Sequence, residues 1–382
     1  MIILDKPYIS PEMLEHLEES KIPVLANATS REKAAEYALL LLDEKEFAEK
    51  LGGGTRIYTV SENSLDWVIN NAEDTELQRG IDVMKNKFAM RKAIQALYPD
   101  YYFTELAIDE LAGFDPSNAP MPFVLKPSVG FFSVGVYVIT SREDWDNALR
   151  DIQKNQAEWQ KRYPNKVVGA GRFLLEEYIK GDEYALDAYF DQDGEPVIVN
   201  IMKHDFSGDA DVKDRLYYTS GPIIRDSLEK FTAFLAALNN EFKLTNFAAH
   251  IEVRLSGDRV IPIECNPIRF AGVCCTDLAW FAYGIRTYDY FLNNRKPDWT
   301  KILEDAGDSI HSLIILDKPA GTDASATFDY QGFGAQFDQV YSQRRYDGKE
   351  LPIFGFLFTR TEKKNERVLQ DVVSTDMRHY LS

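Results

Sequence analysis

Short apolar runs alternate with amphipathic stretches at the start of the chain. The runs "MIIL", "IPVLAN" and "RIYTV" predict strands, and "SPEMLEHLEES" predicts a helix with Ser10 as its cap and Pro11 at its first position. A second helix is predicted over residues 30–51, with Ser30 as its cap and the glycines at 52–54 as its stop. Strands that alternate with helices indicate a parallel sheet covered on both faces.

The pattern changes after about residue 77, where strands begin to dominate. Helices are predicted over residues 86–98, 227–242 and 276–294, single strands at "FVLKPS", "VGVYVIT" and "RFLLEEYI", and hairpins over residues 183–205 and 247–267. The Asp193-Gly194 pair is a turn signal for the first hairpin. The tail from residue 298 predicts a few strands and a closing helix, which is a small α+β extension.

Composition narrows the partners and the compartment. The chain has 382 residues, 45% of them hydrophobic and 27% charged, which suits a folded protein of two or three domains. Its formal net charge of −18 disfavours nucleic acid and anionic lipid, because phosphate binding needs clustered Lys and Arg. No run approaches the roughly 20 apolar residues of a membrane span, and no leader is recognisable, so we expect a cytoplasmic protein. The cysteines and histidines lack the spacings of a zinc site.

Lys126 ends an apolar strand, and a loop with Gly130, Ser133 and Gly135 follows ("FVLKPSVGFFSVGVYVI"). A lysine ammonium beside such a turn can bind a polyphosphate, because the N–H groups of the turn add donors to the positive charge. The GxxxxGK[ST] pattern is absent, so this is not a Walker loop. Taken alone, this signal is weak, because a lysine before a hairpin is usually a solvated strand end.

Two glutamates, Glu252 and Glu264, lie on consecutive strands joined by a Ser-Gly-Asp turn ("HIEVRLSGDRVIPIECNP"). Antiparallel pairing would set both carboxylates and the amide of Asn266 on one face. The other face then takes the apolar residues Ile251, Val253, Ile261 and Ile263. Two carboxylates so close require a cation, and oxygen ligands favour magnesium or manganese. The alternative is a solvated strand surface, which Asn266-Pro267 directly after the carboxylate strand disfavours.

These segments, together with "NKFAM" and "LLEEYIKGDEYALD", occur in an order that resembles the ATP-grasp family over roughly residues 85 to 295. The resemblance implies a mixed α/β and α+β fold. It comprises a pre-ATP-grasp parallel-sheet domain at 1–84, a two-lobed ATP-grasp domain at 85–297 and a C-terminal extension at 298–382. The lobes would span about 100–180 and 181–297. The spacing of the carboxylates is similar to that of the biotin-carboxylase and carbamoyl-phosphate-synthase branch.

The resemblance also implies a role for each matching residue. Nucleotide phosphates would be bound by Lys87, Lys126, Ser128 and Ser133. The adenine would lie along Glu176, Glu177, Tyr178 and Ile179, largely through their backbone, and Glu183 would hold the ribose. Magnesium, or manganese, would be bound by Glu252, Glu264 and Asn266.

Residues on the substrate side depart from the family pattern. The branch often has Arg two residues after the metal-binding Asn, where this chain has Ile268 followed by Arg269. D-alanine ligases have Arg two residues before the first metal carboxylate, where this chain has His250. Arg269 is still the candidate for the substrate carboxylate, and it faces either the site or a surface acid. The polar segment from Ser207 to Arg215 would be a mobile loop over the γ-phosphate, and Lys203, Lys213 and Arg215 are candidates to reach it. The alternative for each of them is a disordered surface loop.

The implied reaction is ATP- and magnesium-dependent activation of a small-molecule carboxylate as an acyl phosphate, followed by attack of an amine or similar nucleophile. Lys126 and Arg269 would offset the growing charge. Amino acids are one candidate substrate class, and a homodimer remains open. The alternatives are a kinase or carboxyphosphate-forming enzyme of the same fold, and a nucleotide-binding regulatory protein without turnover.

Overall fold

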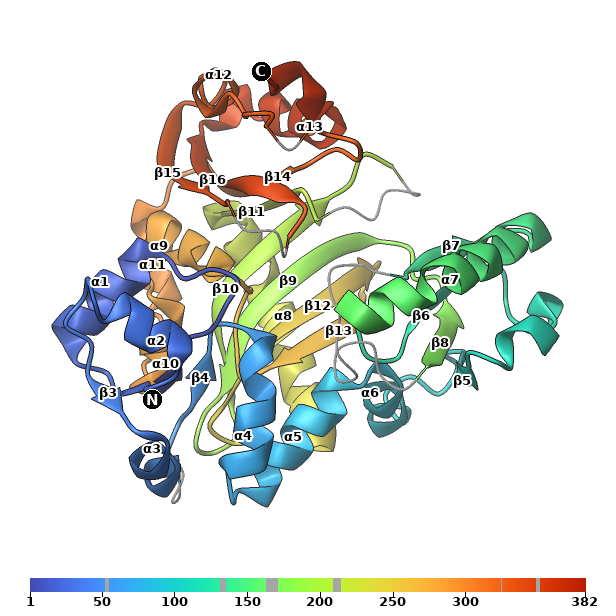
Figure 1. The fold of residues 1–382 in the computed structure, drawn as a ribbon, viewed down its shortest axis with the longest axis horizontal. Coiled ribbons are helices and arrows are strands. Elements are labelled where there is room, and N and C mark those ends of the chain that lie inside the picture. The colour runs from blue at the N-terminus through green and yellow to red at the C-terminus, as the bar shows by residue number, and fades with distance from the viewer. Residues whose placement is uncertain (52–54, 131–134, 163–170, 209–213, 324, 348–350) are drawn as a thin grey trace.

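The computed structural model in Figure 1 describes residues 1–51, 55–130, 135–162, 171–208, 214–323, 325–347 and 351–382, and only the backbone of 156–162. The stop predicted at the glycines 52–54 lies outside the described residues. The described residues form three β-sheets. None of its helices combines the length and the apolar character that crossing a membrane requires.

The N-terminal part forms a four-stranded parallel sheet with the order β3-β2-β1-β4, which confirms the predicted parallel sheet. Its elements are β1 (Ile2–Ile3), α1 (Pro11–Ser20), β2 (Val24–Leu25), α2 (Ala28–Lys33), β3 (Leu41–Leu42), α3 (Glu44–Leu51), β4 (Tyr58–Thr59), α4 (Leu65–Asn71) and α5 (Thr75–Lys85). Helix α1 begins as predicted, because the Ser10 hydroxyl accepts the Met13 N–H at 3.2 Å and Pro11 occupies the first turn.

The single helix predicted over residues 30–51 is wrong. It is two short helices, α2 and α3, separated by the edge strand β3, which pairs in parallel with β2. Ser30 is not the cap but the third helical residue, and it forms a reciprocal capping box with Asn27. The apolar run before residue 43 was misread because a short run fits a strand or a helix equally well by periodicity.

A second unit carries the small antiparallel sheet with the order β5-β8-β6-β7. It follows α6 (Lys87–Ala93) and consists of β5 (Phe103–Ala107), β6 (Phe123–Pro127), β7 (Tyr137–Ile139), α7 (Arg142–Arg162) and β8 (Arg172–Glu177). Its apolar core is separate from the rest of the molecule and is built around Trp145. This unit projects away from the N-terminal and C-terminal parts in Figure 1. Helix α7 was not predicted.

The largest sheet has eight antiparallel strands with the order β13-β12-β9-β10-β11-β14-β16-β15. The strands are β9 (Asp182–Phe190), β10 (Pro196–Asp205), β11 (Leu216–Ser220), β12 (Phe247–Ser256), β13 (Arg259–Pro267), β14 (Ile310–Asp317), β15 (Gln339–Arg345) and β16 (Ile353–Thr361). Helix α8 (Gly221–Phe242) packs on it, and α11 (Trp299–Asp305), α12 (Tyr330–Gly334) and α13 (Arg367–Ser374) complete the C-terminal part. The mixed fold class is therefore confirmed. The strands expected in a separate extension continue this sheet, and the boundary at 298 stays a prediction.

The helix predicted over residues 276–294 is also two helices, α9 (Leu278–Tyr283) and α10 (Thr287–Leu292). They separate at Gly284, whose φ of +69° is left-handed and ends α9. Phe281 of α9 packs against the cluster of Phe356 and Phe358, whereas Tyr288 and Phe291 of α10 belong to the main core.

The small and large sheets are joined by the linker between β8 and β9, which contains Gly181 at φ +136°. A Cβ atom there would overlap the backbone oxygen of Leu255 in β12. Only glycine therefore lets the linker lie directly against the large sheet.

We expect Gly181→Ala to lower the free energy of unfolding by clearly more than Gly257→Ala. Both glycines have positive φ, which costs a residue with a side chain about 1–2 kcal/mol, but nothing lies within 4 Å of a Cβ at Gly257. Urea unfolding of both variants measures the difference. Equal losses would mean that the linker can move away from β12 without cost.

Candidate functional site

Three rows of side chains cross one face of the large sheet, because directly paired residues on antiparallel strands point the same way. The first row is Asn200, Asp187, His250 and Asn266; the second is Met202, Ala185, Glu252 and Glu264; the third is Tyr217, His204, Glu183 and Arg254. The predicted metal carboxylates and the predicted ribose ligand thus come from adjacent rows of one surface.

Glu252 and Glu264 are directly opposite each other across the β12–β13 hairpin. A β-bulge follows Glu252 and shifts the register, so Val253 pairs with Pro262 and Arg254 with Ile261. Ile261 therefore shares the face of the carboxylates, and its predicted place on the other face is wrong. The prediction assumed uninterrupted alternation, which an extra residue in one strand breaks.

Buried cations from α6 and β6 reach this hairpin. The Lys87 ammonium lies 3.1 Å from Glu264 Oε1, and Lys126 donates to the backbone oxygen of Ile263 at 3.3 Å. Lys126 also pairs with Glu176 at 2.6 Å, and Arg91 contacts the other oxygen of Glu176 at 2.5 Å. Burial raises the pKa of Glu176, but Arg91 and Lys126 lower it to about 2. Glu176 thereby fixes two cations where the two sheets meet.

The third row connects the interlobe linker to the large sheet. Glu183 accepts from Arg254 Nε at 3.0 Å and lies 3.1 Å from His204 Nδ1. Arg254 also donates to the Ile179 backbone oxygen at 2.8 Å and to the Tyr178 hydroxyl at 3.3 Å. The linker predicted to contact adenine is therefore fixed to the same surface as the carboxylates.

Backbone N–H groups at the end of β8 and the start of the linker form hydrogen bonds with the unit of the small sheet. The Glu177 and Tyr178 N–H groups donate to Tyr102 and Pro122 oxygens, at 3.1 Å each. The adenine contacts themselves stay a prediction.

Several acids gather on this face. Besides Glu183, Glu252 and Glu264 it carries Asp214, which accepts a hydrogen bond from the Tyr217 hydroxyl at 3.0 Å. Burial raises the pKa of Asp214 to about 6, and the nearby Glu252 adds to this. Such a concentration of negative charge favours a bound cation.

The described residues contain no group of three or more His, Cys, Asp or Glu that could hold a metal ion by themselves. Two carboxylates and an amide oxygen nevertheless fit magnesium, which takes few protein ligands and completes its shell with water and phosphate oxygens. Asn266 is buried and pairs with His250 across the hairpin, one row from the two glutamates. The donor chemistry thus suits a magnesium–nucleotide complex better than a bare ion.

Arg269 does not face solvent, which excludes the alternative of a pair with a surface acid. Only 12% of its side chain is exposed, and Nη2 donates to Glu62 Oε1 at 2.8 Å, while its Nε has no partner in the described structure. Glu62, from the N-terminal part, also pairs with Lys85. Burial opposes ionisation of Glu62, but Lys85 and Arg269 lower its pKa to about 2. One N–H of this buried guanidinium is thus left without a partner in the described structure.

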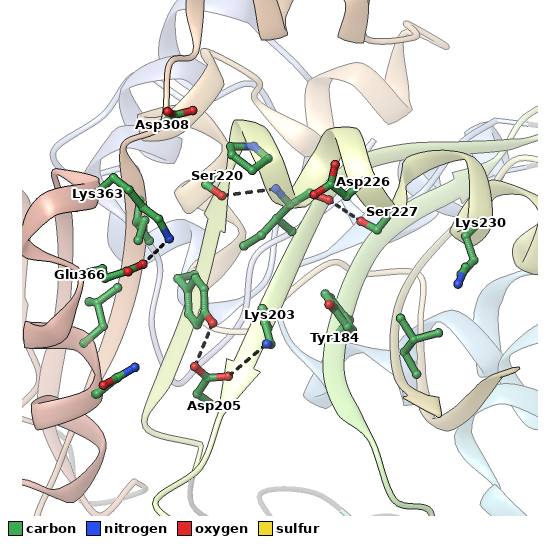
Figure 2. A pocket seen from close by; sticks show the side chains of 17 residues that line it. Tyr184, Lys203, Asp205, Ser220, Asp226, Ser227, Lys230, Asp308, Lys363 and Glu366 are labelled. Atoms are coloured by element: carbon green, nitrogen blue, oxygen red, sulfur yellow. Dashed lines mark hydrogen bonds and ion pairs between the residues drawn. The ribbon is translucent and has the colours of Figure 1, made fainter. Parts of the chain in front are cut away.

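Lys203 is not brought together with the other predicted nucleotide ligands. It neighbours His204 in β10, so its side chain points to the opposite face of the sheet, where it pairs with Asp182 at 3.2 Å. There it lines a cavity of about 520 Å³ between α8 and the segment before α13. Figure 2 shows Lys203 in this cavity with Asp205, Tyr184 and Asp226. Because alternate residues of a strand point to opposite faces, Lys203 lies away from the other predicted nucleotide ligands, contrary to its predicted role.

Arg215 also departs from its predicted role. Its guanidinium pairs with Asp317 at 2.7 Å and donates to the backbone oxygens of Val373 and Thr375 at the end of α13, at 2.9 and 2.6 Å. It caps that helix and is not available to a phosphate.

Ser128 has partners within the structure. Its hydroxyl donates to Glu105 at 2.6 Å, and its backbone oxygen accepts the Lys87 N–H. Ser133 and Lys213 lie outside the described residues.

Sequence reasoning missed several members of the site. Arg91 follows Lys87 by one helical turn, and Arg254 follows Glu252 by two strand positions, so each lies on the same side as a predicted residue. Those periodicities could have identified them. Asp187 and Glu62 gave no local signal, because their partners are distant in sequence.

Comparison with known proteins agrees with this arrangement. Residues 119–277 match the sequence model of the ATP-grasp domain. The chain contains an ATP-grasp domain. The match includes Lys126, the linker and the β12–β13 hairpin, whereas Lys87, Arg91 and Glu62 precede it. No curated protein matches the chain by sequence.

Several solved structures resemble the chain over all or nearly all of its length. An L-amino acid ligase from Bacillus licheniformis has a TM-score of 0.65 at 17% identity, covering 100% of this chain and 97% of that one. An N5-carboxyaminoimidazole ribonucleotide synthetase from Thermotoga maritima has a TM-score of 0.63 at 14% identity, covering 100% and 98%. A biotin carboxylase from Campylobacter jejuni has a TM-score of 0.61 at 11% identity, covering 94% and 87%. At these identities the similarity shows a shared fold.

We expect Glu176 to stabilise the ATP-grasp domain in a pH-dependent way. Its folded pKa of about 2 is below the ordinary value of 4.5, so its contribution is complete above about pH 4.5 and is lost as the pH falls through about 2. Glu176→Gln leaves two buried cations without a full partner and should cost about 3–5 kcal/mol at pH 7.

Urea unfolding between pH 7 and pH 3 measures this, with the exposed Glu73→Gln as control. The difference between Glu176→Gln and wild type should shrink toward pH 3, while the control stays within about 0.5 kcal/mol of wild type throughout. A difference that does not change with pH would contradict the assigned ionisation.

Proposed function

We propose that this protein is an ATP-dependent ligase that activates a small-molecule carboxylate as an acyl phosphate for attack by an amine or similar nucleophile. The observation that carries the proposal is the directly opposed pair Glu252 and Glu264, with Lys87 against one of them. The ATP-grasp domain supports use of ATP, and one structurally similar protein is named an L-amino acid ligase. Amino acids are accordingly the substrate class to test first.

The residues of the chain would divide the work by position. Lys87 and Lys126 would neutralise the nucleotide phosphates, and Glu183 would hold the ribose. Glu252, Glu264 and Asn266 would bind magnesium, which draws charge from the phosphate oxygens during transfer. Arg269 would orient the substrate carboxylate through its unpartnered Nε–H. Arg91 and Glu176 would keep Lys126 in place.

The reaction would then proceed in two steps. An oxygen of the substrate carboxylate attacks the γ-phosphorus, and ADP leaves. The nucleophile next attacks the carbonyl carbon of the acyl phosphate, and inorganic phosphate leaves. Catalysis by these residues would consist of positioning and charge neutralisation, without a covalent enzyme intermediate. Closing the two sheets around the nucleotide would exclude water from the acyl phosphate.

An ADP-release screen with single and paired amino acids tests the function, with hydroxylamine added to trap the intermediate. The proposal expects substrate-dependent ADP and a hydroxamate. ADP without hydroxamate would point instead to phosphoryl transfer to another acceptor. Absence of ADP with every substrate would favour a regulatory nucleotide-binding protein.

Glu264→Gln should reduce magnesium-dependent turnover by at least about a hundredfold, since even partners one step removed from a metal are worth 10–100-fold. Glutamine has the same shape as glutamate, so the variant should still show a cooperative thermal melting curve. Steady-state kinetics of this variant and of the exposed Glu241→Gln provide the comparison. Near-wild-type turnover in folded Glu264→Gln would remove the carboxylate pair from the active site.

Arg269→Lys should leave ATP affinity within about twofold of wild type and lower turnover by at least tenfold, because lysine cannot reproduce the planar donor set of arginine. Glu62→Gln is the matched control, since it weakens the same ion pair and keeps the guanidinium. Equal losses of turnover in the two variants would show that Arg269 only holds the N-terminal part in place.

A further inference from the structure

A buried Asp–His pair lies directly beside the proposed metal carboxylates. Asp187 is fully buried in β9, and its Oδ1 lies 2.7 Å from Nδ1 of His250 in β12. Across the ring, His250 Nε2 lies 3.5 Å from Glu252 Oε1. The imidazole thus lies between the carboxylates of Asp187 and Glu252.

Asp187 is itself rigidly held. It accepts the Ala271 N–H at 2.9 Å and the Thr276 hydroxyl at 2.7 Å, and Thr276 bonds to Thr287 at 2.7 Å. Both Ala271 and Thr276 belong to the loop that follows β13 and carries Arg269. One carboxylate therefore sets the orientation of the histidine ring and fixes the loop of the proposed substrate arginine.

The bonds of Asp187 to the loop do not involve His250. His250 lies in the row of Asn200, Asp187 and Asn266, whereas its neighbours along β12, Ala249 and Ile251, point to the apolar core on the other face of the sheet. Replacing a buried ion pair with apolar groups is often neutral or stabilising. An imidazole whose one nitrogen is fixed by a carboxylate, and whose other nitrogen faces a metal ligand, is a frequent way of orienting that ligand.

We infer that Asp187 and His250 form a positioning pair that holds the Glu252 carboxylate in the orientation required to bind the divalent cation. His250 Nε2–H would hold one oxygen of Glu252, which leaves the other for the cation opposite Glu264. The inference rests on the proposed function, because it takes Glu252 to be a metal ligand. It adds residues that need not touch either substrate.

Two substitutions of His250 separate positioning from a structural role. In His250→Asn the amide nitrogen takes the place of Nδ1, so the bond to Asp187 is kept and the contact with Glu252 is lost. In His250→Gln the amide nitrogen takes the place of Nε2, so the contact with Glu252 is kept and the bond to Asp187 is lost. His311→Gln is the control, since His311 is buried in β14 of the same sheet and bonds to Tyr341 instead.

The measurement is the affinity of the full chain for Mn²⁺ in the presence of ADP, followed by electron paramagnetic resonance. We expect His250→Asn to bind Mn²⁺ at least tenfold more weakly than wild type, His250→Gln within about threefold of wild type, and His311→Gln like wild type. ADP affinity without metal should be within about twofold in all four proteins, and all should melt cooperatively.

Three results overturn the inference while leaving the proposed function intact: wild-type affinity in His250→Asn, a loss in His250→Gln as large as that in His250→Asn, or loss of cooperative melting in His250→Asn. The last result would assign the pair to the fold. If wild type with ADP does not bind Mn²⁺ at all, the metal site of the proposed function fails first, and the positioning role fails with it.

Discussion

The backbone pairing of β12 with β13 places two carboxylates against each other, and the rest of the site depends on this constraint. Glu252 and Glu264 are direct partners in this hairpin, so their side chains leave the same face of the sheet from neighbouring positions. Like charges at that distance repel unless a cation lies between or beside them. Lys87 of α6 lies against Glu264, and His250 of β12 lies beside Glu252. Both side chains are in turn held by residues of the surrounding elements.

The loop after β13 shows how far this support extends. It contains Ile268, Val273 and Cys274 at φ values of +49°, +50° and +59°, a conformation that β-branched side chains rarely adopt. Asp187 holds the loop at Ala271, and Arg344 of the C-terminal strand β15 donates to the Cys274 backbone oxygen at 3.0 Å. Strain of this kind persists where the surroundings fix the backbone, and it is common at functional sites. The C-terminal strands therefore help to shape the proposed substrate side.

Sequence reasoning succeeded where the decisive contacts are local. The opposed glutamates could be predicted because a short turn joins their strands, and the start of α1 because Ser10 and Pro11 act on adjacent backbone groups. It failed where a partner lies far along the chain. Arg215 looks like a loop cation until α13 is placed beside it, and Asp187 is unremarkable until β9 pairs with β12. Lys203 was expected at the nucleotide, but strand alternation places it on the face opposite His204 and the carboxylate rows.

Binding of ATP in the presence and absence of magnesium tests the central claim most directly, namely that two opposed carboxylates form half of a cation site completed by the nucleotide. Titration calorimetry needs no knowledge of the other substrates. The account predicts that ATP binds at least tenfold more tightly with magnesium than in its absence, because an uncompensated triphosphate would meet Glu252 and Glu264 as a third anion. Equal affinity under the two conditions would contradict it.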